Sequence, residues 1–163
     1  MNNDCTPKGC QLRQLMSSTY LSLHYHVVFG TKNREPLINT KWRTRLHEYL
    51  GGTIRGLGGF PEGVGGVADH VHLLIGLKST HCLSDVMREL KKASSAWVHQ
   101  ELGDKAFAWQ EGYAAFTVSS ISRDAVRNYI ANQEDHHRVM PFRKELAAML
   151  EKAGVEYDPR YFD

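Results

Sequence analysis

Residues 67–77 read V-A-D-H-V-H-L-L-I-G-L and predict the strongest β-strand of the chain. Side chains two apart in a strand point to the same face and lie about 7 Å apart along the chain. His70 and His72 therefore share one face, which is expected to look into a groove. The other face carries the apolar residues of the strand and is expected to point into a core: Val71, Leu73 and Ile75. This strand predicts a sheet with one packed face and one face that carries two imidazoles.

A second strand is predicted upstream, over residues 20–30, where the sequence alternates and then becomes apolar. A polar stretch ends it. Asn39 or Thr40 can cap a helix that buries one face and continues to about Leu57. The glycine-rich residues 58–66, which lead into the H-x-H strand, are predicted to form a turn region.

A long helix is predicted downstream, from about Leu83 to Leu102, because its apolar residues recur at helical spacing and Gly103 follows. Residues 107–118 are rich in aromatic side chains and predict another strand. The face of the long helix opposite its apolar stripe carries polar and basic residues, namely Arg88, Lys91, Lys92, Ser95 and His99. The helix is therefore expected to be amphipathic, with a basic stripe toward solvent.

Two helices are predicted after these elements. Ser122 or Asp124 can open a helix that passes through Tyr129 toward Arg138, and Pro141 then interrupts the chain. A last helix is expected from about Pro141 to Lys152. Strands and helices are mixed without strict β-α-β alternation, so the predicted fold class is α+β.

The bulk composition is that of one soluble globular domain. The chain has 163 residues, of which 42% are hydrophobic and 23% charged. We assign the domain to residues 18–163 and expect the polar residues 1–17 to be a disordered leader. No apolar run reaches the roughly 18 residues that a membrane span requires. The net charge of +2 neither requires nor excludes a nucleic-acid partner.

The three cysteines, Cys5, Cys10 and Cys82, are odd in number and stand at spacings that favour neither a disulfide nor a zinc site. A reducing cytoplasm is therefore the expected location.

Two imidazoles on one face of a strand can bind a metal ion if a third ligand comes from elsewhere in the chain. The alternative is two unrelated histidines on a half-exposed strand. A histidine-triad hydrolase would need a third histidine at position 74, which is Leu74. A two-histidine phosphodiesterase would need H-x-T or H-x-S twice, and neither is present. Asp69 points to the opposite face and is a weaker ligand candidate.

The helix that contains V-R-N-Y-I-A-N-Q-E-D-H-H places Tyr129 and Gln133 four residues apart, on one helical face. His136 and His137 follow one turn later, close to the same face. A tyrosine on an amphipathic helix is usually a core or rim residue, so this helix alone does not indicate chemistry. Its combination with an H-hydrophobe-H strand does.

The sequence resembles the single-tyrosine HUH transposases, which are small insertion-sequence enzymes, and their REP-associated relatives. Six blocks carry the resemblance in family order: Y-H-V-V-F-G-T-K-N-R-E-P-L, A-D-H-V-H-L-L-I, L-S-D-V-M-R-E-L-K-K-A-S-S, F-A-W-Q-E-G-Y, T-V and Y-I-A-N-Q. The resemblance implies a ferredoxin-like antiparallel sheet with helices packed on it. It also implies metal ligation by His70, His72 and Gln133, with Tyr129 as the nucleophile. His136 and His137 are typical of only some members and remain possible auxiliary residues.

The implied activity is a metal-dependent DNA strand transferase or nickase that cleaves and rejoins single-stranded DNA through a 5′-phosphotyrosine. The implied cofactor is Mg²⁺ or Mn²⁺, because a divalent cation offsets charge on the phosphate. The implied partners are single-stranded or hairpin DNA and a second copy of the chain, with a monomer as the alternative. Two rival functions stay open: a domesticated DNA-binding or hairpin-processing protein of the same fold, and a metal-dependent hydrolase.

Basic residues at two places are candidate DNA-binding residues. Lys32 and Arg34 follow the first predicted strand, and Arg88, Lys91 and Lys92 form the stripe of the long helix. Such side chains could neutralise phosphates along a hairpin or a single strand. A solvated helix face is the alternative.

Overall fold

A computed structural model describes residues 20–137 and 140–158, and the side chain of His136 is outside the description. The predicted leader over residues 1–17 and the predicted helix end at Arg138 therefore lie outside the described residues. No helix among the described residues is long and apolar enough to cross a membrane.

The described chain forms four strands, five α-helices and one 3-10 turn. In chain order these are β1 (His24–Gly30), η1 (Lys32–Arg34), α1 (Arg43–Gly56), β2 (Phe60–Gly66), β3 (His70–Gly76), α2 (Leu83–Glu101), β4 (Ala114–Thr117), α3 (Arg123–Ala131), α4 (Gln133–His137) and α5 (Phe142–Lys152). The sheet order is β2-β3-β1-β4, and all neighbours are antiparallel. The predicted α+β class and ferredoxin-like sheet are confirmed.

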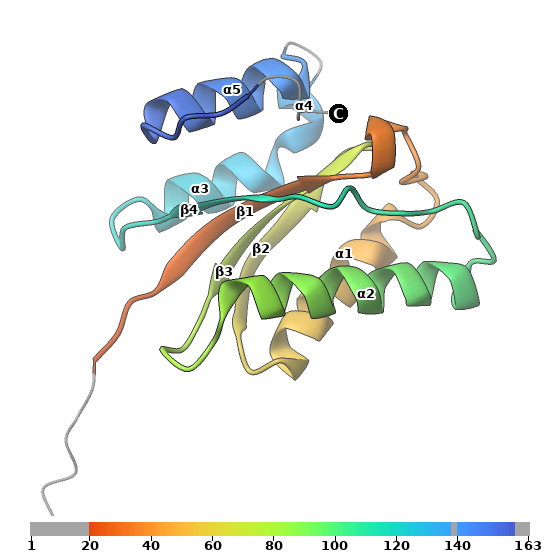
Figure 1. Ribbon diagram of the computed structural model, residues 1–163, viewed down its shortest axis with the longest axis horizontal. Coiled ribbons are helices and arrows are strands. Elements are labelled where there is room, and N and C mark those ends of the chain that lie inside the picture. Colours follow the sequence, from red (N-terminus) through yellow and green to blue (C-terminus); the bar gives the residue numbers. More distant parts are fainter. Residues whose placement is uncertain (1–19, 138–139, 159–163) are drawn as a thin grey trace, which may run out of the picture.

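Helices cover both faces of the sheet. Helices α1 and α2 lie on one face, and α3, α4 and α5 lie on the other (Figure 1). The face under α1 and α2 contains the main apolar core, to which β3 contributes Val71, Leu73 and Ile75. The face under α3 to α5 holds two small apolar clusters and most of the buried polar side chains. The predicted alternation of the central strand is confirmed.

The prediction of a turn region over residues 58–66 is wrong, because most of this segment is strand β2. Gly65 of this strand is explained by close packing against helix α3. Gly65 pairs with His72, and a Cβ atom at Gly65 would lie 2.2 Å from the backbone oxygen of Ile130 in α3. A side chain at this position would collide with the helix, so glycine is required by space and does not mark a turn.

The aromatic strand predicted over residues 107–118 is regular only in β4, Ala114–Thr117. Upstream, Trp109 makes an isolated bridge to Thr31, and the chain then leaves the sheet. Lys91 of α2 donates to the carbonyl oxygens of Gln110, Glu111 and Gly112. These three carbonyl oxygens accept hydrogen bonds from the Lys91 ammonium and not from the backbone of a neighbouring strand. This explains why β4 is shorter than predicted.

The single helix predicted from residue 122 toward residue 138 is broken at Asn132 into α3 and α4. The side-chain amide of Asn132 donates to the backbone oxygen of Asn128 at 2.7 Å. Asparagine side chains that bond to nearby backbone groups compete with regular helix hydrogen bonds. Gln133 and His137 consequently belong to a separate short helix, although the side chains of Tyr129 and Gln133 still meet at Glu145 Oε1. The predicted last helix is confirmed as α5, which begins after Pro141.

Candidate active site

His70 and His72 lie on the sheet face that α3, α4 and α5 cover, and both side chains are completely buried. The expectation that they look into a groove is therefore wrong. The ring of Phe142, at the start of α5, stacks on His70 with 4.1 Å between ring centroids. The sequence shows the shared face of the histidines, but it does not show that the C-terminal helix covers them.

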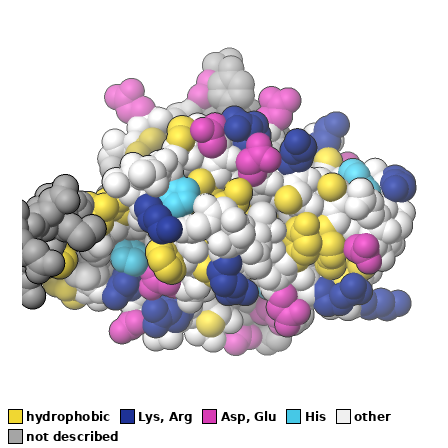
Figure 2. Space-filling view, turned by 90° about the horizontal axis from the view of Figure 1, so that it is seen from below, with side chains coloured by type: hydrophobic (Ala, Val, Ile, Leu, Met, Phe, Trp, Pro, Cys, Tyr) yellow, Lys and Arg dark blue, Asp and Glu magenta, His cyan; other side chains and the backbone are white. Residues whose placement is uncertain are grey.

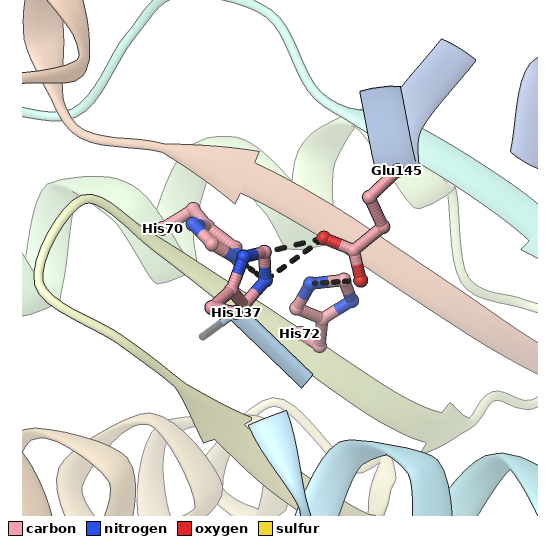
Figure 3. Close-up of side chains that lie close together, drawn as sticks. All are labelled: His70, His72, His137 and Glu145. Atoms are coloured by element: carbon pink, nitrogen blue, oxygen red, sulfur yellow. Dashed lines mark hydrogen bonds and ion pairs between the residues drawn. The ribbon is translucent and has the colours of Figure 1, made fainter. Parts of the chain in front are cut away.

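Four side chains from three distant segments converge above β3. His70 and His72 come from the strand, His137 from α4 and Glu145 from α5 (Figure 3). One ligand atom from each lies within 4.8 Å of every other. Glu145 Oε2 is 2.9 Å from His137 Nε2 and 3.9 Å from His70 Nε2, and its Oε1 is 3.6 Å from His72 Nε2. Three imidazoles and a carboxylate at this spacing could hold one metal ion.

Hydrogen bonds behind the two strand histidines orient their rings. Asp69 Oδ1 lies 2.7 Å from His70 Nδ1, and His26 Nε2 lies 2.9 Å from His72 Nδ1. The carboxylate of Asp69 can only accept, so Nδ1 of His70 carries the hydrogen and Nε2 is left as a donor of electrons to a metal. Contacts of this kind fix the tautomer and orientation of metal-binding histidines. The two Nε2 atoms consequently point toward Glu145.

Tyr129 reaches this cluster from α3. Its hydroxyl donates a hydrogen bond to Glu145 Oε1. Its ring meets those of His72 and His26 edge to face, at centroid distances of 5.8 and 6.0 Å. The half-buried tyrosine, the carboxylate and the histidines of one chain thus form one continuous constellation.

Gln133, the first residue of α4, is also buried beside the cluster. Its amide nitrogen donates to Glu145 Oε1 at 3.3 Å, and its side chain lies against His70, where it opposes in small part the lowering of the imidazole pKa by burial. The structure thus brings together His70, His72, Tyr129 and Gln133. His137, one of the two possible auxiliary histidines, joins them, and Glu145 is added by the structure alone. His136 shares the short helix α4, and its side chain lies outside the description.

Burial dominates the electrostatics of the site. It lowers the pKa of His70, although Asp69 acts in the opposite direction, and it lowers the pKa of His26 to about 4. Burial, together with the charge of Asp69, raises the pKa of Glu145 to about 7. Each shift favours the neutral form of a group that has left water. A divalent cation would favour neutral imidazoles and an ionised Glu145.

A cavity of about 640 Å³ opens beside the tyrosine. It lies between β4, α3 and α5, and its wall includes Tyr129, Glu145 and His26. Apolar side chains make up much of the remaining lining, among them Phe116, Val118, Val126 and Met149. The cavity gives the Tyr129 side chain an approach, whereas His70 and His72 do not line it.

The predicted DNA-binding residues fall into two separate places. Arg34 lies at the edge of the site, with its guanidinium 4.1 Å from the Phe142 ring centroid and 4.0 Å from Asp69 Oδ2. Lys32 precedes it in η1 and is exposed. Arg34 has φ 57°, a left-handed conformation that costs free energy in a non-glycine residue and is enriched at functional sites.

The basic residues of α2 lie on the opposite side of the sheet. On this side Lys and Arg side chains are mixed with Asp and Glu (Figure 2). Arg88 is paired with Asp85 and Glu89, and Lys92 is exposed. Lys91 is committed to three carbonyl oxygens, and burial lowers its pKa to about 8.

Sequence reasoning missed two residues of the site, Glu145 and His26. His26 stands in the pattern H-Y-H of the first strand, the same spacing that drew attention to His70 and His72, so this signal was available. Glu145 is one of several charged residues on an amphipathic helix. Only the packing of α5 over the sheet distinguishes it, and no local pattern does.

Comparisons with known proteins identify the family. The model of the IS200-like transposases matches residues 19–133. The ISDra2 transposase TnpA of Deinococcus radiodurans is 26% identical over 119 residues, covering 69% of this chain and 85% of the relative. A crystal structure of a putative transposase from Deinococcus radiodurans R1 shares 25% identity, with a TM-score of 0.58, over 71% of this chain and 95% of that one.

A REP-associated tyrosine transposase, whose structure was solved bound to a REP hairpin, has the same fold. Its TM-score is 0.55 and its identity 17%, with coverage of 75% of this chain and 74% of that chain. The family match ends at Gln133, so Glu145 and the rest of α5 lie beyond it. More than half of the chain matches the family model, in the order of elements that the structure shows. The chain belongs to the family of IS200-like transposases, whose activity is DNA strand transfer.

Proposed function

We propose that this chain cleaves and rejoins single-stranded DNA, with Tyr129 as nucleophile and a divalent metal at His70, His72, His137 and Glu145. The observation that carries the proposal is the convergence of the Tyr129 hydroxyl with this cluster through Glu145. Gln133 is a further candidate ligand, because its buried amide lies against Glu145 and His70. Membership of the transposase family supports the reaction class.

The donor set fits a metal ion. Neutral imidazole nitrogens and a carboxylate oxygen are ordinary ligands of first-row divalent metals, whereas Mg²⁺ prefers oxygen and water. Three imidazoles therefore favour Mn²⁺ over Mg²⁺. When bound, the cation would polarise the non-bridging oxygens of a phosphate and offset their charge.

In the proposed step the Tyr129 hydroxyl oxygen attacks the phosphorus of a phosphodiester. A bond forms between that oxygen and phosphorus, and the bond from phosphorus to the 3′ oxygen breaks. The 3′ oxygen leaves and takes a proton from solvent water, which makes it a free hydroxyl. The tyrosine proton passes to Glu145 Oε1, which already accepts its hydrogen bond. Glu145 Oε2 faces His137 and His70, so the two oxygens of this carboxylate can act on the tyrosine and the metal separately.

The product is a 5′-phosphotyrosine. It retains a phosphodiester bond, so attack by a 3′-hydroxyl rejoins DNA without ATP. The proposed substrate is a single strand or hairpin, in keeping with the hairpin bound by the REP-associated relative. The Tyr129 hydroxyl bonds to Glu145 of its own chain, beside the histidines of that chain, which supports action of Tyr129 within its own subunit. Homodimer formation stays a prediction.

The test is incubation of the protein with labelled hairpin DNA and Mn²⁺, followed by a denaturing gel. The expected result is DNA that migrates covalently bound to wild-type protein and to the control Tyr113→Phe. Tyr129→Phe should give no adduct while binding the hairpin within about threefold of wild type, because only a hydroxyl is removed. Cleaved DNA without an adduct would show a hydrolase instead. Hairpin binding without cleavage would show a domesticated binding protein.

A mixing experiment tests whether one chain supplies the whole site. Equal amounts of Tyr129→Phe and His72→Ala protein should form no adduct, because neither chain then has both the nucleophile and the complete cluster. An adduct in the mixture, absent from each variant alone, would show that tyrosine and histidines act from different subunits.

A further inference from the structure

A second cluster of charged and polar side chains, away from the proposed metal ligands, surrounds Glu62 on the edge strand β2. The Glu62 carboxylate pairs with Nδ1 of His24 on β1 and with two arginines of α3, Arg123 at 3.6 Å and Arg127 at 3.2 Å. The side chains of Glu62 and His24 are each only 14% exposed. Glu62 therefore joins two strands of the sheet to the helix that carries Tyr129.

The hydrogen bonds of this cluster are mutually consistent. Arg123 Nη1 lies 3.2 Å from His24 Nε2, and a guanidinium can only donate, so Nε2 of His24 accepts. Nδ1 of His24 then carries the hydrogen and lies next to Glu62 Oε1. Arg127 donates to Glu62 through Nη2 and to Asp124 through Nη1. The hydrogen bonds that Arg123 and Arg127 donate are thus compatible with one tautomer of His24.

Helix α3 is also pressed onto the same strand by packing. Gly65 allows the backbone of α3 at Ile130 to approach β2, where no side chain would fit. Ile130 packs in an apolar cluster with Leu74 and Val118. This contact holds the end of α3 beyond Tyr129, and the Glu62 cluster holds its beginning. Tyr129 lies between the two points of attachment, so its height above His72 depends on both.

We propose that Glu62 is a positioning residue for Tyr129, which acts by binding Arg123 and Arg127 and thereby fixing α3 on the sheet. The inference rests on the proposed function, because it concerns the placement of the proposed nucleophile. Displacement of reacting groups by about 1 Å can cost about 100-fold in rate. Loss of the Glu62 carboxylate should therefore slow adduct formation without weakening DNA binding.

The two arginines admit a different role, as phosphate ligands of DNA. The two roles predict opposite effects for Glu62→Ala. If Arg123 and Arg127 bind phosphates, removal of the competing carboxylate frees them, and affinity for DNA rises while the chemistry is unchanged. If they attach α3 to the sheet, affinity stays near that of wild type and the chemistry slows.

The experiment measures the rate constant of adduct formation at saturating hairpin DNA, and separately the dissociation constant over a range of salt. Glu62→Ala should lower the rate constant by about tenfold or more and change the dissociation constant by less than about twofold. Glu62→Gln, which keeps the shape and one acceptor oxygen, should lie between Glu62→Ala and wild type. The control is Glu48→Ala, which removes an exposed acidic residue of α1 and should change neither quantity.

Arg123→Ala/Arg127→Ala should reproduce the loss of rate, and adding Glu62→Ala should cause little further loss, because the three residues act as one unit. If the arginines bound DNA, this double variant would lower the log–log salt slope of binding by about 0.7 for each lost contact. An unchanged rate in Glu62→Ala, or tighter DNA binding at an unchanged rate, would overturn the proposal.

Hydrogen exchange gives a measurement that needs no activity. The backbone amides of α3 should exchange about tenfold faster in Glu62→Ala than in wild type, while those of α1 and α2 stay unchanged. Wild-type protein that forms no adduct would refute the proposed function. The attachment of α3 by Glu62 would then be decided by the exchange rates alone, and unchanged exchange would refute it.

Discussion

The two faces of the sheet differ in what they bury. The face under α1 and α2 buries an apolar core, in which residues such as Leu46, Leu50 and Leu90 are inaccessible to solvent. The face under α3 to α5 buries His26, His70, His72, Gln133 and Glu145. Strand β3 contributes to both, because its alternating side chains point to opposite layers.

The difference between the faces shows how a small domain separates stability from chemistry. Apolar burial stabilises the sheet from one side. On the other side polar groups are removed from water, which costs free energy unless they are paired or hold a metal. The apolar face can therefore support a face that is organised for reaction and contributes less to stability. Substitutions at neighbouring residues of β3 should separate the two contributions.

The largest expected contrast is between His72→Ala and Leu73→Ala. His72→Ala should reduce adduct formation at least about 1000-fold, because the cluster loses a ligand. It should cost about 1–3 kcal/mol of unfolding free energy, since His26 loses its partner. Leu73→Ala should cost about 2–5 kcal/mol through the cavity it leaves, and the folded fraction should keep its activity.

Urea unfolding and adduct yield, measured on the same preparations without and with Mn²⁺, provide the comparison. Mn²⁺ should stabilise wild type and Leu73→Ala and should stabilise His72→Ala much less, because binding to the folded state alone raises stability. Equal stabilisation of all three proteins by Mn²⁺ would show that the metal binds elsewhere.

A second contrast concerns how the free energy of unfolding changes at acidic pH in wild type and in a variant at His26. The pKa of His26 is lowered to about 4 by burial, so the folded state resists a proton that the unfolded chain accepts at about pH 6.5. The stability due to neutral His26 is complete above pH 6.5 and is lost as the pH falls toward 4, by about 3 kcal/mol. His26→Gln should flatten the fall of unfolding free energy over this range, measured without metal. Parallel pH profiles for the two proteins would contradict this assignment.

Glu145 changes the pH dependence of stability in the opposite direction to His26. Its contribution cancels when wild type is compared with His26→Gln, because both proteins contain Glu145. Its pKa is raised to about 7, so the metal-free folded state gains stability from it as the pH falls from 7 toward the ordinary range of a carboxyl group.

The smallest expected effects distinguish two neighbouring lysines of α2. Lys92 is exposed, and Lys92→Ala should lower the log–log salt slope of DNA binding by about 0.7 if it contacts a phosphate. Lys91→Ala should leave the slope unchanged and cost about 1–2 kcal/mol of stability, because three carbonyl oxygens lose their donor. A lower salt slope with unchanged stability in Lys91→Ala would show that Lys91 contacts DNA and is not needed for folding.

Much of the apolar face could be predicted from sequence. The stripe of α2 and the alternation of β3 are periodic signals, and buried residues such as Val86, Leu90 and Leu73 follow from them. Strand β2 could not be predicted in this way. Its residues Gly63, Gly65 and Gly66 lack the side chains on which a strand signal depends. Gly65 is required by helix α3, which lies far along the chain, and Gly66 by the close backbone of β3 at His70.

The candidate site was predictable only where local patterns exist. The H-x-H spacing drew attention to His70 and His72, and the spacing on the helix drew attention to Tyr129, Gln133 and His137. The family resemblance then gave roles to all of these except His137, which stayed a possible auxiliary residue. The position of Glu145 depends on a long-range packing event, the docking of α5 over β1 and β3. The burial of His70 and His72 depends on the same packing of α5. This one unpredicted contact explains both why Glu145 was missed and why a groove was expected.

Gly65 also has a consequence for variation of this sequence. Gly65 lies on β2 opposite His72, and the distance between β2 and α3 is as short as it is because Gly65 has no Cβ atom. Even alanine at residue 65 must move α3 outward, because the atom it would meet is backbone and cannot rotate away. Random mutagenesis should therefore find this residue as intolerant as the metal ligands themselves, although it has no functional group.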